Sequence, residues 1–470
     1  MNSRDLDDRA VQGYQPPMSS WVRDDRAASG YHPQRRMIFS LAASTSFLLY
    51  LHRYTWNLVR PELQAEYGLS NTQLETIGSA FFFPYALGQI PCGIICDLFG
   101  PHLFLVAIIL AWSLLLPLQG MTGNFWALLT VRGGFGLAQA GCYPALSQVT
   151  RAWFPLRSRT QIQGWVAAAF GRGGGAMASI IMGTFMMGYL GMSWLASLWT
   201  LSFVGVLFAF VFLFLFRNSP PAPVDAAPPI DLPATTSSTA APSLPEPPRV
   251  LPFRVALRNR SYLILLVQQF LNAGSDVVFT LILGSYFLSL GAENSGTLGL
   301  LISLPLVGGA LGGVFGGYAN DWALQRFSSR RWCRAAVAGI GMGIGGLLVL
   351  LAVTSPDPLK VALGLLVARF FADWNQPTVW GTCTDLGGRY SATVFGITNM
   401  AGNMGAFMTP FAVGILLDYF SVSELVDGQA VITTNYVPAF ILCGGMMLVA
   451  AAAWLVIDCS KRIVPDIDED

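Results

Sequence analysis

Long apolar stretches alternate with short polar stretches along most of the chain. Each apolar stretch is close to the roughly 20 residues that a helix needs to cross a bilayer. The pattern therefore predicts twelve transmembrane helices. Their approximate ranges are 37–58, 74–96, 103–121, 125–148, 162–188, 193–216, 261–289, 298–320, 335–354, 360–383, 393–418 and 436–458.

Two polar segments divide the chain. Residues 1–36 mix Pro, Asp and Arg without a signal-peptide pattern, and residues 217–258 are rich in Pro, Ala, Ser and Thr. Neither composition can bury a core, so we expect a disordered cytoplasmic tail and a flexible cytoplasmic linker. The predicted fold class is an all-α integral membrane protein with two pseudo-symmetric six-helix bundles. The bundles are expected at 37–216 and 259–460, and a second cytoplasmic tail at 461–470.

Composition supports a membrane protein and argues against several other classes. The chain is 53% hydrophobic and 11% charged, whereas soluble domains carry about 25% charged residues. The net charge of +1 gives no reason to expect nucleic acid as a partner. The seven cysteines mostly lie in apolar runs. The sequence shows no cluster of metal ligands, no catalytic Ser/His/Asp set or cysteine nucleophile, and no phosphate-binding loop. We therefore predict no enzyme activity, no metal and no cofactor.

The basic residues predict the orientation of the chain in the membrane. Arginines such as Arg35, Arg151 and Arg254 gather in the segments that share a side with the termini and the linker. The opposite side carries little beyond Arg60 and Lys360. The positive-inside rule then places both termini in the cytoplasm. We expect a multi-pass protein of the inner (plasma) membrane.

A short internal repeat supports two related halves. The second predicted span ends in Gly93-Ile-Ile-Cys-Asp97, and the eighth ends in Gly317-Tyr-Ala-Asn-Asp321. Both are Gly-x-x-x-Asp at the same place in their half. Repeated halves are typical of secondary transporters, in which two bundles rock about a central site.

Three longer stretches resemble the major facilitator superfamily. They are SAFFFPYALGQIPCGIICDLFGPH at 79–102, the run at 131–164 and GRYSATVFGITNMAGNMGAFMTP at 388–410. More narrowly, they resemble its organic anion:cation symporter branch, which includes hexuronate, galactonate and glycerol-3-phosphate carriers. The similarity covers nearly the whole chain apart from the tail and the linker. It implies two six-helix bundles around a central cavity that work by alternating access.

Arg53 is the first candidate site residue, because it lies inside the first predicted span. An arginine at that depth costs roughly 2.5–3.5 kcal/mol on insertion scales, so it should face a water-filled cavity or a partner. Its guanidinium offers a planar fork of donors that suits an oxyanion. The resemblance implies that Arg53 holds the carboxylate or phosphate of the substrate. An arginine that reaches the outer interface, or one locked in a structural ion pair, is the alternative.

The sequence departs from the branch beside this arginine. His52 stands where the branch has Asp, and Gln139 stands where it has Glu, seven residues after Arg132. Seven residues are two helical turns, so Arg132 and Gln139 share a helix face. The resemblance assigns the two acids to proton coupling, but Gln139 cannot titrate and His52 titrates near neutrality. His52 is either a replacement coupling residue or a neutral hydrogen-bonding histidine.

Arg172 is a third buried cation, flanked by glycines in the fifth span. It predicts either a further anion-binding group or a partner for Asp276 or Asp373 in the other half. Arg369 and Asp373 are four residues apart on one helix, which predicts an intrahelical ion pair. Asp276 and Asp373 are also candidates for coupling.

Polar side chains on other helices could recognise the rest of a substrate. The resemblance places Tyr85 at a position that lines the substrate cavity. Asn399 and Asn403 are four residues apart on one helix face, and with Gln139 they could bind hydroxyl groups of a sugar acid. Hydrogen bonding between helices is the alternative for the two asparagines.

The repeated motif also has an expected function. The resemblance implies that Asp97 and Asp321 hold the cytoplasmic side shut. We group them as gating residues with the glycines of the same motif, which are Gly93, Gly100 and Gly317.

Taken together, these residues predict a monomeric secondary active transporter in the lipid bilayer, which moves a small organic anion such as a sugar acid by alternating access. Proton or sodium is the possible coupling ion. An uncoupled uniporter or an anion exchanger of the same fold is the alternative. A channel or a transporter-like receptor fits less well, because paired halves and interior arginines favour a carrier with one central site.

Overall fold

The computed structural model describes residues 34–69, 71–218, 250–276, 278–291, 295–426 and 429–464. Residues 1–33 of the predicted tail and most of the predicted linker therefore lie outside the described residues, as do residues 465–470, while residues 34–36 already belong to a helix. Helices make up nearly all of the described chain.

The helices before the linker are called the N half below. They are α3 (Gln34–Tyr54), α4 (Trp56–Tyr67), α5 (Asn71–Ser79), α6 (Phe82–Phe99), α7 (Pro101–Leu118), α8 (Phe125–Ala140), α9 (Cys142–Trp153), α10 (Leu156–Gly164), the π-helix η1 (Trp165–Gly171), α11 (Arg172–Ala178), the π-helix η2 (Ser179–Tyr189) and α12 (Trp194–Leu215).

The elements after the linker form the C half. They are α13 (Phe253–Ala256), α14 (Arg260–Ser275), the π-helix η3 (Val278–Ile282), α15 (Leu283–Ser289), α16 (Ser295–Arg326), α17 (Arg330–Ala352), α18 (Pro358–Ala372), α19 (Asn375–Gly387), the 3-10 helix η4 (Gly388–Tyr390), α20 (Ser391–Tyr419), β1 (Ser421–Val426), β2 (Gln429–Thr434) and α21 (Val437–Ala453).

Each of the twelve predicted spans coincides with one helix or with a run of consecutive helices. Six helical segments of the described chain are long and apolar enough to cross a membrane, and the helix Val437–Ala453 is a shorter apolar one. Several of the predicted spans are broken into shorter helices. The fifth is divided among α10, η1, α11 and η2, and the seventh among α14, η3 and α15. Hydropathy alone does not predict these breaks.

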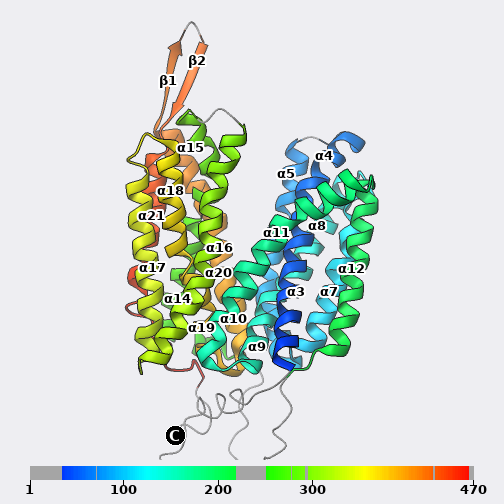
Figure 1. Cartoon of the computed structure of the whole chain (residues 1–470), viewed down its shortest axis with the longest axis vertical. Coiled ribbons are helices and arrows are strands. Elements are labelled where there is room, and N and C mark those ends of the chain that lie inside the picture. The colour runs from blue at the N-terminus through cyan, green and yellow to red at the C-terminus, as the bar shows by residue number, and fades with distance from the viewer. Residues whose placement is uncertain are drawn as a thin grey trace, which may run out of the picture.

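The two strands form an antiparallel hairpin that pairs Ser421 with Thr434 at one end and Val426 with Gln429 at the other. Hydropathy does not predict the hairpin, since it lies in the connection between the last two spans. Figure 1 shows it at one end of the C half, which is called the hairpin side below. Helix α3 begins and α21 ends at the opposite end, called the termini side.

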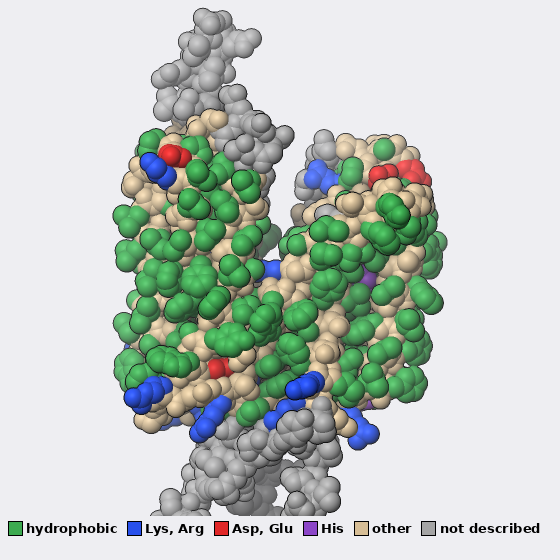
Figure 2. All heavy atoms as spheres, in the orientation of Figure 1, with side chains coloured by type: hydrophobic (Ala, Val, Ile, Leu, Met, Phe, Trp, Pro, Cys, Tyr) green, Lys and Arg blue, Asp and Glu red, His purple; other side chains and the backbone are tan. Residues whose placement is uncertain are grey.

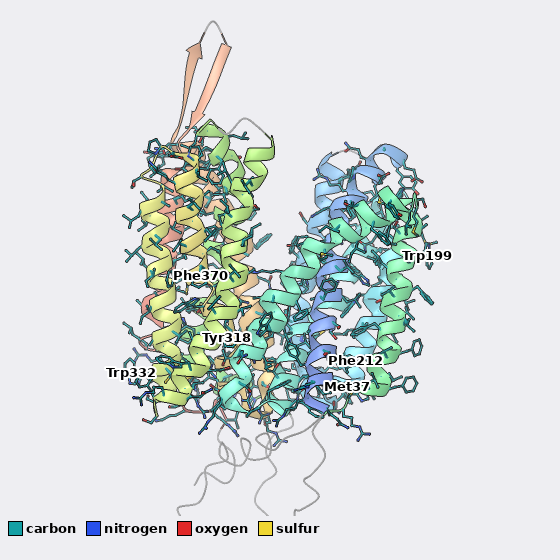
Figure 3. The ribbon with its side chains drawn as sticks, in the orientation of Figure 1. Met37, Trp199, Phe212, Tyr318, Trp332 and Phe370 are labelled. Atoms are coloured by element: carbon teal, nitrogen blue, oxygen red, sulfur yellow. The ribbon has the colours of Figure 1, made fainter. Side chains whose placement is uncertain are left out.

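The N half and the C half stand side by side and meet toward the termini side (Figure 1). Figure 2 shows an open cleft between them on the hairpin side, with basic side chains gathered along the termini side. Trp199 and Trp332 lie on the outer faces of the two halves (Figure 3), where they are 49% and 53% exposed. Exposed aromatic side chains of this kind are typical of surfaces that contact lipid.

Glycines allow the halves to approach closely on the termini side. A Cβ atom at Gly93 of α6 would lie 2.7 Å from the carbonyl oxygen of Ala392 in α20. A Cβ atom at Gly317 of α16 would lie 2.9 Å from the carbonyl oxygen of Thr160 in α10. These glycines are the first residues of the two Gly-x-x-x-Asp repeats. The repeat therefore marks two pseudo-symmetric contacts between backbones, which any side chain would push apart.

Candidate substrate site

Arg53 of α3 sits in a cage of aromatic rings. Its guanidinium carbon lies 4.9 Å from the centre of the Tyr50 ring, 4.7 Å from that of Phe81 and 4.8 Å from that of Tyr85. Its Nε donates a hydrogen bond of 3.0 Å to Oε1 of Gln139 in α8. Its Nη2 is buried and has no partner among the described residues. No carboxylate in the described chain forms an ion pair with it, so its charge meets the faces and hydroxyls of the tyrosine rings and one amide oxygen.

Arg132 of α8 is also without a carboxylate, but it is more enclosed. It is 4% exposed, and its guanidinium lies over the rings of Trp56, Phe81 and Phe135 at 4.7 to 5.6 Å. Its Nη1 donates to Oε1 of Gln119 at 2.9 Å. The Phe81 ring thus contacts both Arg53 and Arg132. The N half therefore holds two arginines for which the described residues provide no ion-pair partner.

Arg132 and Gln139 share one face of α8, as their spacing predicts. Gln139 binds Arg53 there, while Arg132 binds Gln119. The Nε2 of Gln139 donates to the backbone oxygen of Leu49 in α3 at 3.3 Å. Gln139 therefore joins α8 to α3 and fixes the position of the Arg53 side chain.

His52 points away from this cage. It is fully buried where α3 meets α7 and α12. A Cβ atom at Gly205 of α12 would lie 2.8 Å from Cε1 of His52 and 2.2 Å from the hydroxyl oxygen of Ser113 in α7. Neighbouring residues on a helix project about 100° apart, so His52 and Arg53 face different neighbours. In this conformation His52 has no direct contact with the substrate site.

The rings beside Arg53 continue into the contact between the halves. The ring centres of Tyr50 and Tyr143 of α9 are 6.3 Å apart, and those of Tyr143 and Trp380 of α19 in the C half are 5.0 Å apart. The ring centres of Trp380 and Phe395 of α20 are 4.7 Å apart. The hydroxyl groups of Ser46 and Tyr143 are 3.0 Å apart. Sequence reasoning missed this aromatic layer, because rings that face lipid and rings that join helices look alike in an apolar sequence.

Arg172 belongs to a chain of ion pairs that crosses from the N half to the C half. Its Nη1 is 2.5 Å from Oδ2 of Asp373. Asp373 also binds Nη2 of Arg369 at 3.2 Å, which confirms the predicted intrahelical pair. Arg369 forms two bonds with Asp276 at the end of α14, one of them 2.9 Å long, and lies over the Phe279 ring. Of the two alternatives for Arg172, the structure therefore shows the one in which it pairs with an acid.

Asn399 and Asn403 continue the face of α20 that contacts the N half. Gly396 on that face lies against the backbone oxygen of Gln89 in α6. Asn399 and Asn403 follow at near-helical spacing toward the hairpin side, where the halves diverge. Both are partly buried, and Nδ2 of Asn403 donates to the backbone oxygen of Asn399 at 2.8 Å. They thus lie beside the cleft, on the C half.

Asp97 and Asp321 bind the backbone of the opposite half. Asp97 of α6 accepts hydrogen bonds from the backbone nitrogens of Ala392 and Thr393 at 3.1 and 2.8 Å. Asp321 of α16 accepts from the backbone nitrogens of Thr160 and Gln161 at 3.3 and 2.7 Å. Ala392 and Thr393 belong to the first turn of α20, where unpaired N–H groups and the helix dipole favour an anion. Thr160 and Gln161 lie in the second turn of α10.

Gly100 of the same motif has φ of +80°. Glycine adopts this left-handed conformation without steric cost, which allows the sharp turn from α6 into α7.

Comparisons with known proteins now identify the family. Residues 42–410 match the sequence profile of the Major Facilitator Superfamily. The chain belongs to the Major Facilitator Superfamily. This confirms the predicted family and fold class, and it makes the chain a transporter rather than an enzyme.

Its relatives cover almost all of the chain. The probable sulfoacetate transporter of Cupriavidus necator is 26% identical over 429 residues, which are 90% of this chain and 94% of the relative. The probable L-galactonate transporter of Escherichia coli is 25% identical over 412 residues, 86% of this chain and 85% of the relative. The hexuronate transporter of Bacillus subtilis is 22% identical over 414 residues, 86% of this chain and 90% of the relative.

A solved structure shares the fold. The crystal structure of the transporter FucP in the outward conformation matches with a TM-score of 0.62 and 16% sequence identity. The match covers 89% of this chain and 98% of FucP.

Proposed function

We propose that this transporter carries a small organic anion, such as a sugar acid or a similar carboxylate, and that Arg53 binds its anionic group. The observation that carries the proposal is that Arg53 has an unpaired donor and no carboxylate partner among the described residues. A buried cation inside a membrane protein needs compensation. An oxyanion at Nη2 would supply it with a charge-assisted hydrogen bond.

Other residues around the cleft would recognise the remainder of the substrate. Tyr85 and Gln139 lie against Arg53, while Asn399 and Asn403 lie on the facing half. Their hydroxyl and amide groups suit the hydroxyls of a sugar acid. Arg132 would act at longer range through its charge, because Phe81 separates it from Arg53. The organic acids in the names of the relatives support this class of substrate.

We further propose that the termini side faces the cytoplasm and that the molecule is seen in its outward-open state. The basic side chains gathered on that side support this orientation (Figure 2). In the proposed cycle, substrate enters from the hairpin side and the halves rock about it. The bonds from Asp97 and Asp321, with the glycine contacts at Gly93 and Gly317, would then separate to release it.

Two candidate functions differ in coupling. Arg53 has no acid beside it in the described part of the chain, and His52 points away from it. Both observations favour an exchanger or uniporter that needs no ion gradient. The alternative is coupling to protons or sodium through Asp276 or Asp373. A third way to move the anion, a channel, is disfavoured by the layer of rings between the cleft and the termini side.

Counterflow of labelled organic anions in proteoliposomes tests the proposal. We expect saturable uptake by the wild-type chain and none by Arg53→Ala. The matched control is Arg389→Ala, because Arg389 is exposed and lies outside the site. Wild-type rates in Arg53→Ala would refute the assignment of Arg53. Accumulation that requires an imposed gradient would favour the coupled carrier over the exchanger.

A further inference from the structure

Six side chains of the N half are fully buried and carry polar atoms without a hydrogen-bond partner in the described chain. His52, Trp112 and Ser113 belong to α3 and α7, away from the C half. The other three are Gln89 of α6, Ser147 of α9 and Gln163 of α10, each 0% exposed. Both polar atoms of the two glutamine amides and the hydroxyl of Ser147 are unpaired. Buried polar groups are nearly always paired, so several orphaned groups in one region require an explanation.

Ser147 lies just beyond the aromatic layer on the termini side. It follows Tyr143 by four residues on α9, so it shares the face with which Tyr143 contacts Trp380 of the C half. Gln148 next to it points elsewhere, because its Oε1 accepts a hydrogen bond from Sγ of Cys96 in α6. Ser147 is therefore directed toward the other half, below the contact between Tyr143 and Trp380.

Gln89 points into the same region from α6. Gly93 and Cys96 follow it by four and seven residues, so all three lie on nearly the same side of the helix. Cys96 is hydrogen-bonded to Gln148 of α9, and Gly93 lies against Ala392 of α20. The side chain of Gln89 projects between these two directions at the helical period, toward the junction of α9 and α20.

Gln163 enters the region from α10. Arg159, one turn before it, donates to the backbone oxygen of Phe154 at the end of α9. Thr160 accepts a hydrogen bond from Arg334 of the C half. Gln163 projects between these two directions, toward the gap between α9 and the C half. All three side chains thus lie between the aromatic layer and the bonds made by Asp97 and Asp321.

We propose that Gln89, Ser147 and Gln163 line the cytoplasmic half of the transport path, where they bind the oxyanion and hydroxyls of the leaving substrate. This inference rests on the proposed function. In the outward-open state these groups only destabilise the closed termini side. When the halves part there, water and substrate satisfy them. They therefore offset part of the loss of the hydrogen bonds from Asp97 and Asp321, and they favour opening toward the cytoplasm.

Thr382 of α19 provides a matched control. Its hydroxyl is also buried and unpaired. It follows Thr378 by four residues, however, and Thr378 bonds Asn320 within the C half. Thr382 therefore lies on the face of α19 that meets α16 of the same half, and we expect it to stay enclosed throughout the cycle.

Labelling of introduced cysteines tests the proposal. Ser147→Cys and Thr382→Cys are close in size to the native residues, and their counterflow rates report whether they fold. A membrane-impermeant maleimide is applied from each face of the membrane, and the parent chain gives the background of its native cysteines. We expect Ser147→Cys to react from the termini side at least about tenfold faster than Thr382→Cys. Equal rates in vesicles that show counterflow would overturn the assignment.

A second substitution tests the claim that the unpaired polar groups favour opening of the termini side. Gln163→Leu removes an orphaned amide from the closed state, so it should slow the labelling of Ser147→Cys by about tenfold. Thr382→Val should leave that rate unchanged. An unchanged rate in Gln163→Leu would overturn the claim that these groups favour opening. Labelling without counterflow of any anion would instead refute the proposed substrate class while supporting the path.

Discussion

Arg369 of the C half and the two arginines Arg53 and Arg132 of the N half have opposite surroundings. Arg369 binds both Asp276 and Asp373, and Arg172, which reaches across from the N half, completes a chain of two positive and two negative charges. Arg53 and Arg132 meet rings and amide oxygens but no carboxylate of the described chain. The comparison suggests that the ion pairs anchored in the C half stabilise structure, while the charges of Arg53 and Arg132 in the N half are available to a substrate.

The largest expected effect is on anion binding. Arg53→Gln removes the charge and the unpaired donor, so we expect counterflow to fall by at least about 100-fold, the equivalent of about 3 kcal/mol. The fold should be retained, since no buried acid loses a partner. Thermal unfolding in detergent checks this, and labelled-anion counterflow checks the loss. A variant that transports but unfolds at lower temperature would reverse the roles that we assign to the two halves.

The second effect concerns stability in the C half. Asp373 is the shared partner of two arginines, so Asp373→Asn leaves Arg172 without its ion-pair partner and weakens the environment of Arg369. Removing one member of a buried pair costs about 3–5 kcal/mol. Arg172→Gln should cost less, because Arg172 is partly exposed and Asp373 keeps Arg369. The double variant should be less destabilised than the sum of the two, as measured by a double-mutant cycle of thermal unfolding. Additive losses would show that the pair is not coupled.

These contrasts also show how far the sequence could predict the structure. The approximate positions of the helices followed from hydropathy, because every segment that crosses a bilayer must be mostly apolar. The pair of Arg369 and Asp373 followed from spacing on one helix. The partner of Arg172 was narrowed to Asp276 or Asp373, since spacing does not say which acid of another helix comes near, and the structure shows Asp373.

The contacts that close the termini side were the least visible in the sequence. Asp97 and Asp321 bind backbone N–H groups, and every residue except proline has one. The sequence therefore identifies the two carboxylates that accept these hydrogen bonds but not the backbone N–H groups that donate them. The contact between Tyr143 and Trp380 has the same difficulty, because many other aromatic residues occur in the apolar spans. Arg53 was easier to select as a candidate, since a charge in an apolar span is rare.

A third prediction makes the N half resemble the C half. Gln139→Glu would place a carboxylate where the amide now accepts from Nε of Arg53. The new ion pair should compete with the substrate and weaken its binding by about tenfold. Lower pH protonates the introduced carboxyl and releases Arg53, so counterflow by the variant should rise as pH falls. The parent chain, measured alongside, should lack this rise. A variant with unchanged affinity would mean that the substrate does not use Arg53.

The smallest expected effect is at His52, the titratable residue next to Arg53 in the chain. Its ring is enclosed by α7 and α12 and does not reach the cage around Arg53. We therefore expect His52→Gln to leave the pH profile of counterflow unchanged between about pH 6 and about pH 8, the range in which an ordinary histidine titrates. The matched substitution is His102→Gln, which alters a histidine at the termini side of α7. If only the change at position 52 flattens the profile, protons reach the site through the N half. The absence of a carboxylate beside Arg53 would then reflect a change of coupling group and not a loss of coupling.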